Sequence, residues 1–370
     1  MFLARFFDYG SDPVGDARLG IPLSYPDVEH YFADHVKPSN VFRVVVLGDS
    51  QTVNVPYDLG YPKLLQDFLD QQDLGTKKVE VYNAGAHGHS PYQYYLTLSE
   101  RLIKFKPDLV VVAFYIGNDF LDLYRNDDRP SLVFDKSGFH HRAPFFLKFR
   151  VLEPEAWWTS FRVARLFYAT WKRAIGYQIS RVRAIWAIGQ NSDEGFTASA
   201  KYLYTIARGS SISDAIFRQS MNQILFLKRF PKEQVAINRI NSHILDLMAS
   251  LSRSQEFRLL YMPIPSKLQI EPETTEPVLQ QTLDLCGFDR KALRLEDLLT
   301  ENLMTSLDEH KIASINILTV MRRLRSETAF YDSSYHLAPE GHRVIASILG
   351  PVVAKTVIDS TINASIIRPN

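Results

Sequence analysis

Three short runs of apolar, mostly β-branched residues constrain the fold more than any other feature of this sequence. They occupy residues 42–47 (FRVVVL), 78–82 (KVEVY) and 108–115 (DLVVVAFY). The first and third are apolar at successive positions, as are strands of a parallel sheet that is covered on both faces. Residues 61–72 (YPKLLQDFLDQQ) follow the first run and carry apolar residues at helical spacing. This order of strand, helix and strand predicts an α/β protein.

Later segments repeat the same rhythm. Helical patterns recur at about 91–105, 232–253 and 339–355, and strand-like runs at 257–262 (FRLLYM) and near 312–317. Because parallel strands are joined by right-handed crossovers, this alternation predicts a three-layer α/β/α, doubly wound sandwich with a mainly parallel sheet of about five strands. In such a sheet the functional site lies at the carboxyl ends of the strands.

The main domain is expected over residues 41–360, after an irregular lead-in of residues 1–40 that is rich in Pro, Gly, Asp and Tyr. Between about 126 and 230 the rhythm breaks, and helical patterning without a chemistry motif predicts a helical insertion. Within it, a helix at about 159–187 separates aromatic from basic residues on two faces. That helix is either a membrane-surface or anionic-substrate element, or a core-packed helix with a solvated basic face, which we favour.

Composition narrows the function classes. The chain has 370 residues and a net charge of +1, so no whole-protein field favours a nucleic-acid partner. Cys286 is the only cysteine, and the histidines lack carboxylates at ligand spacing, so we expect neither a metal nor another cofactor. Arg5 and Asp8 interrupt any signal peptide, and no run approaches the roughly 18 apolar residues of a membrane span. As written, the sequence predicts a cytoplasmic protein; a truncated start would make it an exported one.

Polar residues and glycines follow each of the first three strands. The segment VVVLGDSQT places Ser50 where the chain turns into a helix, whose N-terminus favours a developing negative charge. The second strand ends in NAGAHGHS, with Gly85 and Gly88, and the third ends in YIGNDF, with Asn118. Backbone N–H groups at glycines and an Asn amide can donate to an oxyanion. Each feature taken alone also fits an ordinary turn or helix cap.

The segment FYDSSYHLAPEGHRVIA places His336 in a loop just before the last helix, whose first turn suits Pro339. A neutral imidazole can take the Ser50 proton and return it to a leaving group. Asp332 is the nearest acid, four residues before His336. It either orients the imidazole or leaves that task to a backbone carbonyl in a serine–histidine dyad. We expect structural or substrate-contact roles for three other histidines: His87 and His89 after the second strand, and His342 in the last helix.

The segments GDS, NAGAHG, GND and DSSYHLAPEGH occur in the order of the SGNH (GDSL-type) hydrolase blocks, so residues 42–125 and 232–355 resemble a bacterial-type member of that superfamily. The resemblance implies a flavodoxin-like fold with Ser50 as nucleophile and His336 as general base. It also implies an oxyanion hole formed by the Ser50 N–H, the Gly88 N–H and the Asn118 side chain. The family commonly places its aspartate three residues before the histidine, so Asp332 departs from the pattern. YMPIPSKLQI is similar to a loop common in bacterial members and receives no catalytic role.

The resemblance implies a serine-dependent ester hydrolase that acts through an acyl-enzyme on acetyl or short acyl esters of carbohydrates. Three alternatives stay open: an O-acyltransferase for a sugar or polysaccharide with the same residues, a lipid esterase, and a catalytically weakened binding protein of the same fold. The expected partner is a small-molecule or carbohydrate ester. A membrane contact would involve residues 159–187, and the oligomeric state does not follow from the sequence.

Overall fold

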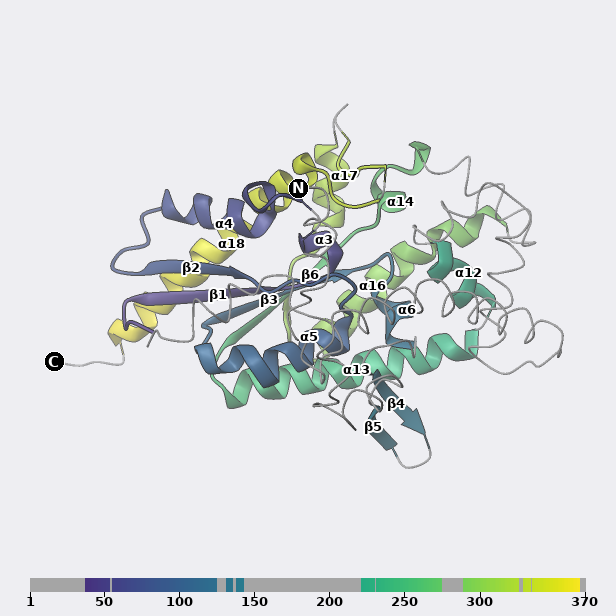
Figure 1. Ribbon diagram of the computed structural model, residues 1–370, viewed down its shortest axis with the longest axis horizontal. Helices are drawn as coiled ribbons and strands as arrows, with labels where there is room; N and C mark the ends of the chain where they lie inside the picture. The colour runs from purple at the N-terminus through teal and green to yellow at the C-terminus, as the bar shows by residue number, and fades with distance from the viewer. Residues whose placement is uncertain are drawn as a thin grey trace, which may run out of the picture.

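The computed structural model describes residues 37–124, 131–142, 221–274, 289–325 and 329–366, apart from residues 54, 136–137, 230 and 334. Its centre is a five-stranded sheet in the order β2-β1-β3-β6-β7, in which each neighbouring pair is parallel (Figure 1). The strands are β1 (Val41–Leu47), β2 (Lys78–Asn83), β3 (Leu109–Tyr115), β6 (Arg258–Ile264) and β7 (Ala313–Ser314). The predicted parallel sheet is confirmed.

Helices cover both faces of this sheet. On one face lie α4 (Tyr61–Asp70) and α18 (Pro339–Ile366), and on the other lie α5 (Pro91–Thr97) and α13 (Pro231–Ser254) (Figure 1). The predicted three-layer architecture is therefore confirmed.

Alternate residues of one strand enter the two halves of the core, because successive side chains of a strand point to opposite faces. In β1, Val44 and Val46 pack in the cluster that contains α4 and α18, whereas Val45 and Leu47 pack in the cluster that contains α5 and α13. All four side chains are buried. The apolar run at residues 42–47 thus reflects burial on both sides.

The remaining elements connect this framework. After β1 come α3 (Ser50–Val53) and a short 3-10 helix (Tyr57–Leu59); α5 continues through a π-helical turn (Leu98–Leu102) and a 3-10 turn (Ile103–Phe105). After β3 come α6 (Asp119–Tyr124), the antiparallel hairpin of β4 (Ser131–Asp135) and β5 (Gly138–Arg142), and α12 (Met221–Arg229). After β6 come α14 (Lys267–Ile270), a 3-10 helix (Arg290–Arg294), α16 (Leu295–Glu309) and α17 (Leu318–Leu324).

Three details differ from the sequence-based expectations. The fifth strand is only Ala313–Ser314, shorter than the predicted 312–317. The last helix runs to Ile366, beyond the predicted 355, because residues 356–366 contain neither Gly nor Pro to end it. Within the predicted helical insertion, residues 131–142 form the β4–β5 hairpin. Residues 1–36 of the predicted lead-in and the predicted basic helix at 159–187 lie outside the described residues.

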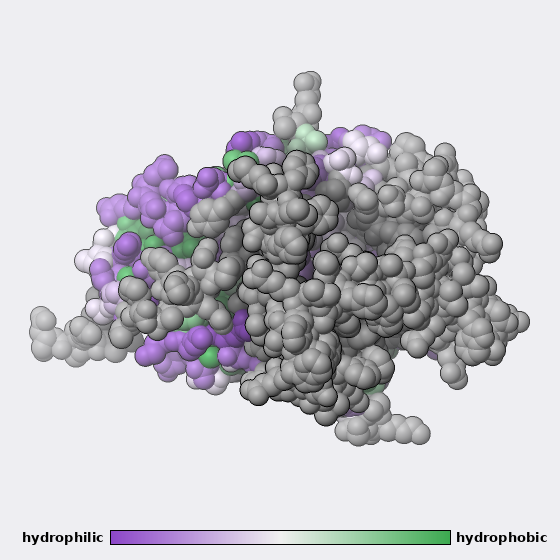
Figure 2. Space-filling model, in the orientation of Figure 1, coloured by the Kyte–Doolittle hydropathy of each residue, from purple (hydrophilic) through white to green (hydrophobic). Residues whose placement is uncertain are grey.

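The stretch Pro339–Ser360 of α18 has the length and hydropathy of a membrane span, which the sequence analysis does not anticipate. In the fold, 56% of this stretch is buried, and the helix packs beside α4 on the sheet (Figure 1). The core helix of a globular domain has the same composition, and the described surface near α4 is mostly hydrophilic (Figure 2).

Candidate active site

Ser50 begins α3, at the carboxyl end of β1, as the sequence predicts. The turn that carries it is tight, since a Cβ on Gly48 would lie 2.0 Å from the Thr52 Oγ1 atom. Asp49 supplies the cap, because its Oδ1 atom accepts a hydrogen bond of 2.8 Å from the Gln51 N–H. These contacts hold the Ser50 side chain, which is half-buried, at the edge of the sheet.

Gly88 lies in the loop after β2, and this loop is hydrogen-bonded to the turn that carries Ser50. The Ala86 N–H donates to the Gly48 carbonyl over 3.0 Å, and the His89 N–H donates to the Ala86 carbonyl over 3.1 Å. Gly88 has a φ of 72° inside that second turn, a conformation that glycine adopts without strain. The structure therefore places Gly88 in a loop that contacts the turn of Ser50.

Asn118 lies at the carboxyl end of β3, where its carbonyl accepts the Asp122 N–H over 2.9 Å and so begins α6. The Ile116 N–H donates to the Ile264 carbonyl over 2.9 Å, which fixes this turn to the end of β6. The side-chain Oδ1 atom of Asn118 is buried and has no hydrogen-bond partner within the part of the chain that the structure describes. The oxygen end of this amide therefore does not hold the fold.

His336 meets Ser50 at this edge of the sheet. Its Nε2 atom lies 3.1 Å from the Ser50 Oγ atom, although 286 positions separate the two residues in sequence. The Asp332 N–H donates to the His336 carbonyl over 2.8 Å, and the His336 N–H donates to Asp332 Oδ1 over 3.0 Å. The carboxylate of Asp332 thus holds the backbone of the histidine, and its predicted role in orienting the imidazole ring stays a prediction.

Burial lowers the pKa of His336 below its usual value, Asp332 opposes this shift, and His87 adds to it. A lowered pKa keeps the imidazole neutral at neutral pH, which is the form that accepts a proton. The surrounding protein partly desolvates His87 and so lowers its pKa as well, although much of the residue is exposed. The site therefore carries two neutral imidazoles near pH 7.

His342 has a structural position. Its side chain is buried, its ring stacks on Tyr61 at 5.7 Å between centroids, and its Nδ1 atom accepts the Tyr61 N–H over 3.2 Å. This contact joins the start of α18 to the start of α4. His89 is also buried, with 1% of its surface exposed.

A buried carboxyl follows Asn118 at the start of α6. Asp119 is buried, and it accepts hydrogen bonds from the Tyr94 hydroxyl and the Tyr115 N–H at 3.1 and 2.9 Å. Burial, followed by the charges of Asp49 and Asp122, raises the pKa of Asp119 well above its usual range.

Among the described residues, no three His, Cys, Asp or Glu side chains gather as a metal-binding group.

The histidine turn is held by the segment after β6, to which the sequence analysis assigns no catalytic role. The Glu271 Oε1 atom accepts the N–H groups of Phe330 and Tyr331 at 2.5 and 3.1 Å. The Lys267 ammonium donates to the Asp332 carbonyl over 2.9 Å. The sequence did not indicate that these two residues support the site; their signal was the segment PSKLQIEPE directly after β6.

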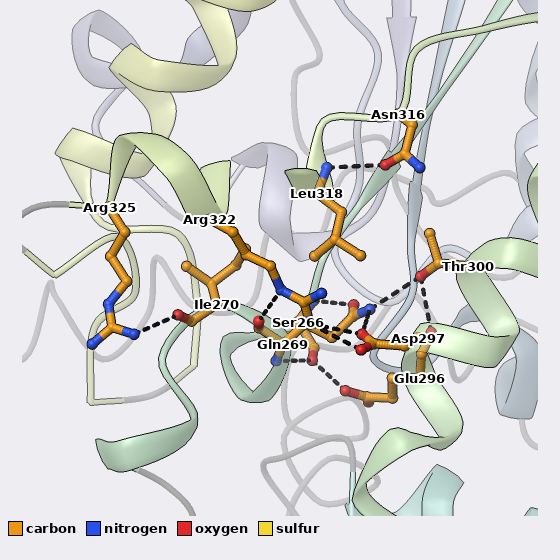
Figure 3. A network of polar contacts seen from close by, with 10 residues as sticks. All are labelled: Ser266, Gln269, Ile270, Glu296, Asp297, Thr300, Asn316, Leu318, Arg322 and Arg325. Carbon is orange, nitrogen blue, oxygen red and sulfur yellow. Dashed lines mark hydrogen bonds and ion pairs between the residues drawn. The ribbon is translucent and has the colours of Figure 1, made fainter. Parts of the chain in front are cut away.

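A polar network holds α14 itself in place (Figure 3). Ser266 bonds the carboxylate of Glu296 in α16 and accepts the Gln269 N–H over 3.2 Å. The Gln269 amide donates to Asp297 over 2.9 Å, and Arg322 of α17 donates to the same carboxylate over 2.8 Å. Helices α16 and α17 therefore brace the short helix that in turn contacts the histidine turn.

Comparisons with known proteins show solved structures whose backbone arrangement is similar to that of this chain. No protein-family model and no curated protein sequence matches the chain. Similar solved structures include TesA, at 13% identity and a TM-score of 0.38 over 84% of this chain and 96% of that one. A putative acylhydrolase from Bacteroides fragilis has 11% identity and a TM-score of 0.42 over 90% of this chain and 98% of that one. A catalytic mutant of Axe2, an acetylxylan esterase from Geobacillus stearothermophilus, has 11% identity and a TM-score of 0.40 over 83% and 91%.

Proposed function

We propose that this protein is a serine-dependent ester hydrolase of the SGNH type that acts through an acyl-enzyme. The observation that carries the proposal is the 3.1 Å contact between the Ser50 Oγ and His336 Nε2 atoms at the carboxyl ends of parallel strands. A hydroxyl within hydrogen-bond reach of a neutral imidazole is the arrangement that activates a serine nucleophile.

In the first step, the Ser50 Oγ atom attacks the ester carbonyl carbon while His336 Nε2 accepts the hydroxyl proton. The tetrahedral intermediate then expels the alcohol, which leaves with that proton, and an acyl-serine forms. Water enters, gives a proton to His336 and attacks the acyl carbon. Release of the acid returns the proton to Ser50, so the cycle closes without a cofactor.

Three groups are proposed to stabilise the negative charge on the tetrahedral oxygen: the N–H groups of Ser50 and Gly88 and the side-chain amide of Asn118. Ser50 supports this role because it begins a helix, where N–H groups lack intrahelical partners. The position of Asn118 supports it, because Asn118 follows β3, which pairs with β1, and so lies at the same edge of the sheet as Ser50.

The proposed substrates are acetyl or short acyl esters of carbohydrates, a class that comes from the sequence resemblance. The same residues would serve an O-acyltransferase if a sugar hydroxyl replaced water as the acceptor of the acyl group. A lipid esterase would differ in preferring long acyl chains. The assay below therefore separates these activities by acyl length and by acceptor.

The test is hydrolysis of p-nitrophenyl acetate, butyrate and octanoate by the wild type, Ser50→Ala and Asp332→Asn. We expect Ser50→Ala to lose at least about 1000-fold in kcat, because the covalent route is closed. Asp332→Asn should lose less, because an amide oxygen can still accept the His336 N–H. Equal rates for wild type and Ser50→Ala would remove Ser50 as nucleophile, and turnover that requires an added sugar would favour the transferase.

A pH profile of kcat/KM gives a second readout. The lowered pKa of His336 predicts that activity persists below the usual imidazole pKa of 6.5 and declines only at lower pH. If kcat/KM already fell at pH values above 6.5 as the pH was lowered, this result would contradict His336 as the base.

A further inference from the structure

Gln51, the residue after the proposed nucleophile, contacts the turn of the proposed base with both ends of its side chain. Its Nε2 atom donates to the Tyr335 carbonyl over 3.1 Å, and its Oε1 atom accepts the Leu337 N–H over 2.9 Å. These two backbone groups lie on either side of His336. Gln51 is 3% exposed, so both bonds are shielded from water.

The geometry of the turn explains why one amide can hold it. Residues 330–332 pair with residues 336–338 as a small antiparallel bridge, through the bonds Asp332 N–H to His336 carbonyl and Ala338 N–H to Phe330 carbonyl, both 2.8 Å. In such a bridge the N–H of residue 337 and the carbonyl of residue 335 point away from the pair. The Gln51 amide takes the place that a third strand would occupy on that edge.

The backbone beside the histidine needs such support. Tyr335 has a φ of 66°, a left-handed conformation that is unfavourable for a residue other than glycine. A strained conformation persists only where its surroundings determine it, and the Gln51 amide bonds the carbonyl of this residue. Loss of that bond would let the peptide before His336 relax.

The main chain of Gln51 belongs to the nucleophile turn, because its N–H donates to Asp49 Oδ1 over 2.8 Å. One residue therefore joins the backbone that carries Ser50 to the backbone that carries His336. We propose that Gln51 is a positioning residue, whose amide sets the distance between Ser50 Oγ and His336 Nε2; this rests on the proposed function. Misplacement of a reacting group by about 1 Å costs on the order of 100-fold in rate.

The chain offers a matched control in Gln66 of α4. Its Nε2 atom donates to the Val79 carbonyl over 3.1 Å, and its Oε1 atom accepts the Val81 N–H over 2.7 Å, so it also bonds residues i and i+2 of an extended segment. That segment is the edge strand β2, and the bonded residues lie before its carboxyl end. Gln66→Met removes the two corresponding bonds, and also the bond of 2.8 Å from Gln66 Nε2 to Asp70 Oδ1 within α4, without touching the site.

The experiment compares Gln51→Met, Gln51→Glu and Gln66→Met with wild type, and uses Ser50→Ala as the reference for the chemistry. Methionine keeps the length of the side chain and loses both bonds, whereas glutamate keeps the acceptor for Leu337. We expect Gln51→Met to lower kcat about 100-fold with KM changed less than about threefold. Gln66→Met should keep the wild-type kcat while its midpoint of urea unfolding falls below that of wild type, because it loses hydrogen bonds to β2.

A second measurement does not depend on ester turnover. The pKa of His336, followed by NMR and assigned from the signal lost in His336→Gln, should rise toward its usual value in Gln51→Met, because the ring leaves its buried position. It should not move in Gln66→Met. An unchanged His336 pKa together with wild-type kcat in Gln51→Met would overturn the inference while Ser50→Ala still tests the proposed function. A shifted pKa with a fully active Ser50→Ala would keep Gln51 as the positioning residue and remove the proposed chemistry.

Discussion

The two halves of the site are held by different means. On the strand side, the turns of Ser50 and Asn118 are fixed by main-chain bonds between neighbouring strands, such as Ala86 to Gly48 and Ile116 to Ile264. On the other side, the turn of His336 has its own short bridge and depends on side chains that arrive from elsewhere in the chain. The strand half is set by the register of the sheet, and the histidine half is set by individual side chains.

This difference teaches where a substitution should separate activity from stability. A residue of the strand half can lose its side chain while the main-chain bonds persist. A residue that supports the histidine turn loses its contact when its side chain is removed, because the side chain itself makes the hydrogen bond. Three substitutions test this contrast.

The largest effect is expected for Asn118→Ala in the strand half. Loss of one oxyanion donor should lower kcat about 100- to 1000-fold. The unfolding free energy should stay within about 1 kcal/mol of wild type, because the amide oxygen has no partner among the described residues. Ester assays and urea unfolding measure the two quantities.

Asn316→Ala is the matched control, since the Asn316 Oδ1 atom accepts the Leu318 N–H over 3.1 Å at the start of α17. It should lose about 1 kcal/mol of stability and keep its kcat. If Asn118→Ala kept the wild-type kcat, Asn118 would not belong to the oxyanion hole.

The next effect is expected for Glu271→Ala, which supports the histidine half. The change leaves the buried N–H groups of Phe330 and Tyr331 without their acceptor, so we expect a loss of about 3 kcal/mol in unfolding free energy and a lower kcat. Glu271→Gln keeps an acceptor oxygen and should lose less than half as much. A Glu271→Ala protein with unchanged stability and kcat would contradict the contrast between the two halves.

The smallest effect is the pH dependence of stability that comes from His342, where α18 leaves the histidine turn. Burial lowers its pKa from 6.5 to about 4, so its neutral form favours the folded state. Stability is full above pH 6.5 and falls as the pH decreases, because only the unfolded chain then takes up the proton. The loss should reach about 2 kcal/mol near pH 5.

His342→Asn isolates this contribution, since its amide oxygen can still accept the Tyr61 N–H. The difference in unfolding free energy between wild type and variant should be constant above pH 6.5 and should change by about 2 kcal/mol near pH 5. A difference that does not vary with pH would show that His342 does not titrate in this way.

The same contrast explains what could be predicted from the sequence. The strand half was accessible because a buried parallel strand leaves an apolar run, and the residue after it must lie at the sheet edge. That rule placed Ser50, Gly88 and Asn118 at one edge of the sheet, and their proposed roles came from the resemblance of the motifs. The separate hairpin β4–β5 could not be predicted, since its twelve-residue span lies in a segment whose helical patterning dominates.

The histidine half could be predicted only through its motif. His336 was found from its position before a helix, but no local pattern shows that Gln51 and Lys267 reach its turn across 286 and 65 positions. Such contacts depend on which strands are neighbours in the folded sheet, and a local sequence pattern does not show this. Asp332 shows the same limit, because its carboxylate bonds the His336 backbone, a contact that the spacing of four residues does not predict.

The distance in sequence between Ser50 and His336 also has a consequence for synthesis on the ribosome. A nascent chain contains the segments of β1, β2 and β3 early, whereas His336, the proposed base, emerges only with the last elements. Contacts between distant parts of a chain form late and slowly. Under the proposed function, Ser50 lacks its base until the C-terminal segment has folded, and the onset of ester cleavage during synthesis would report that step.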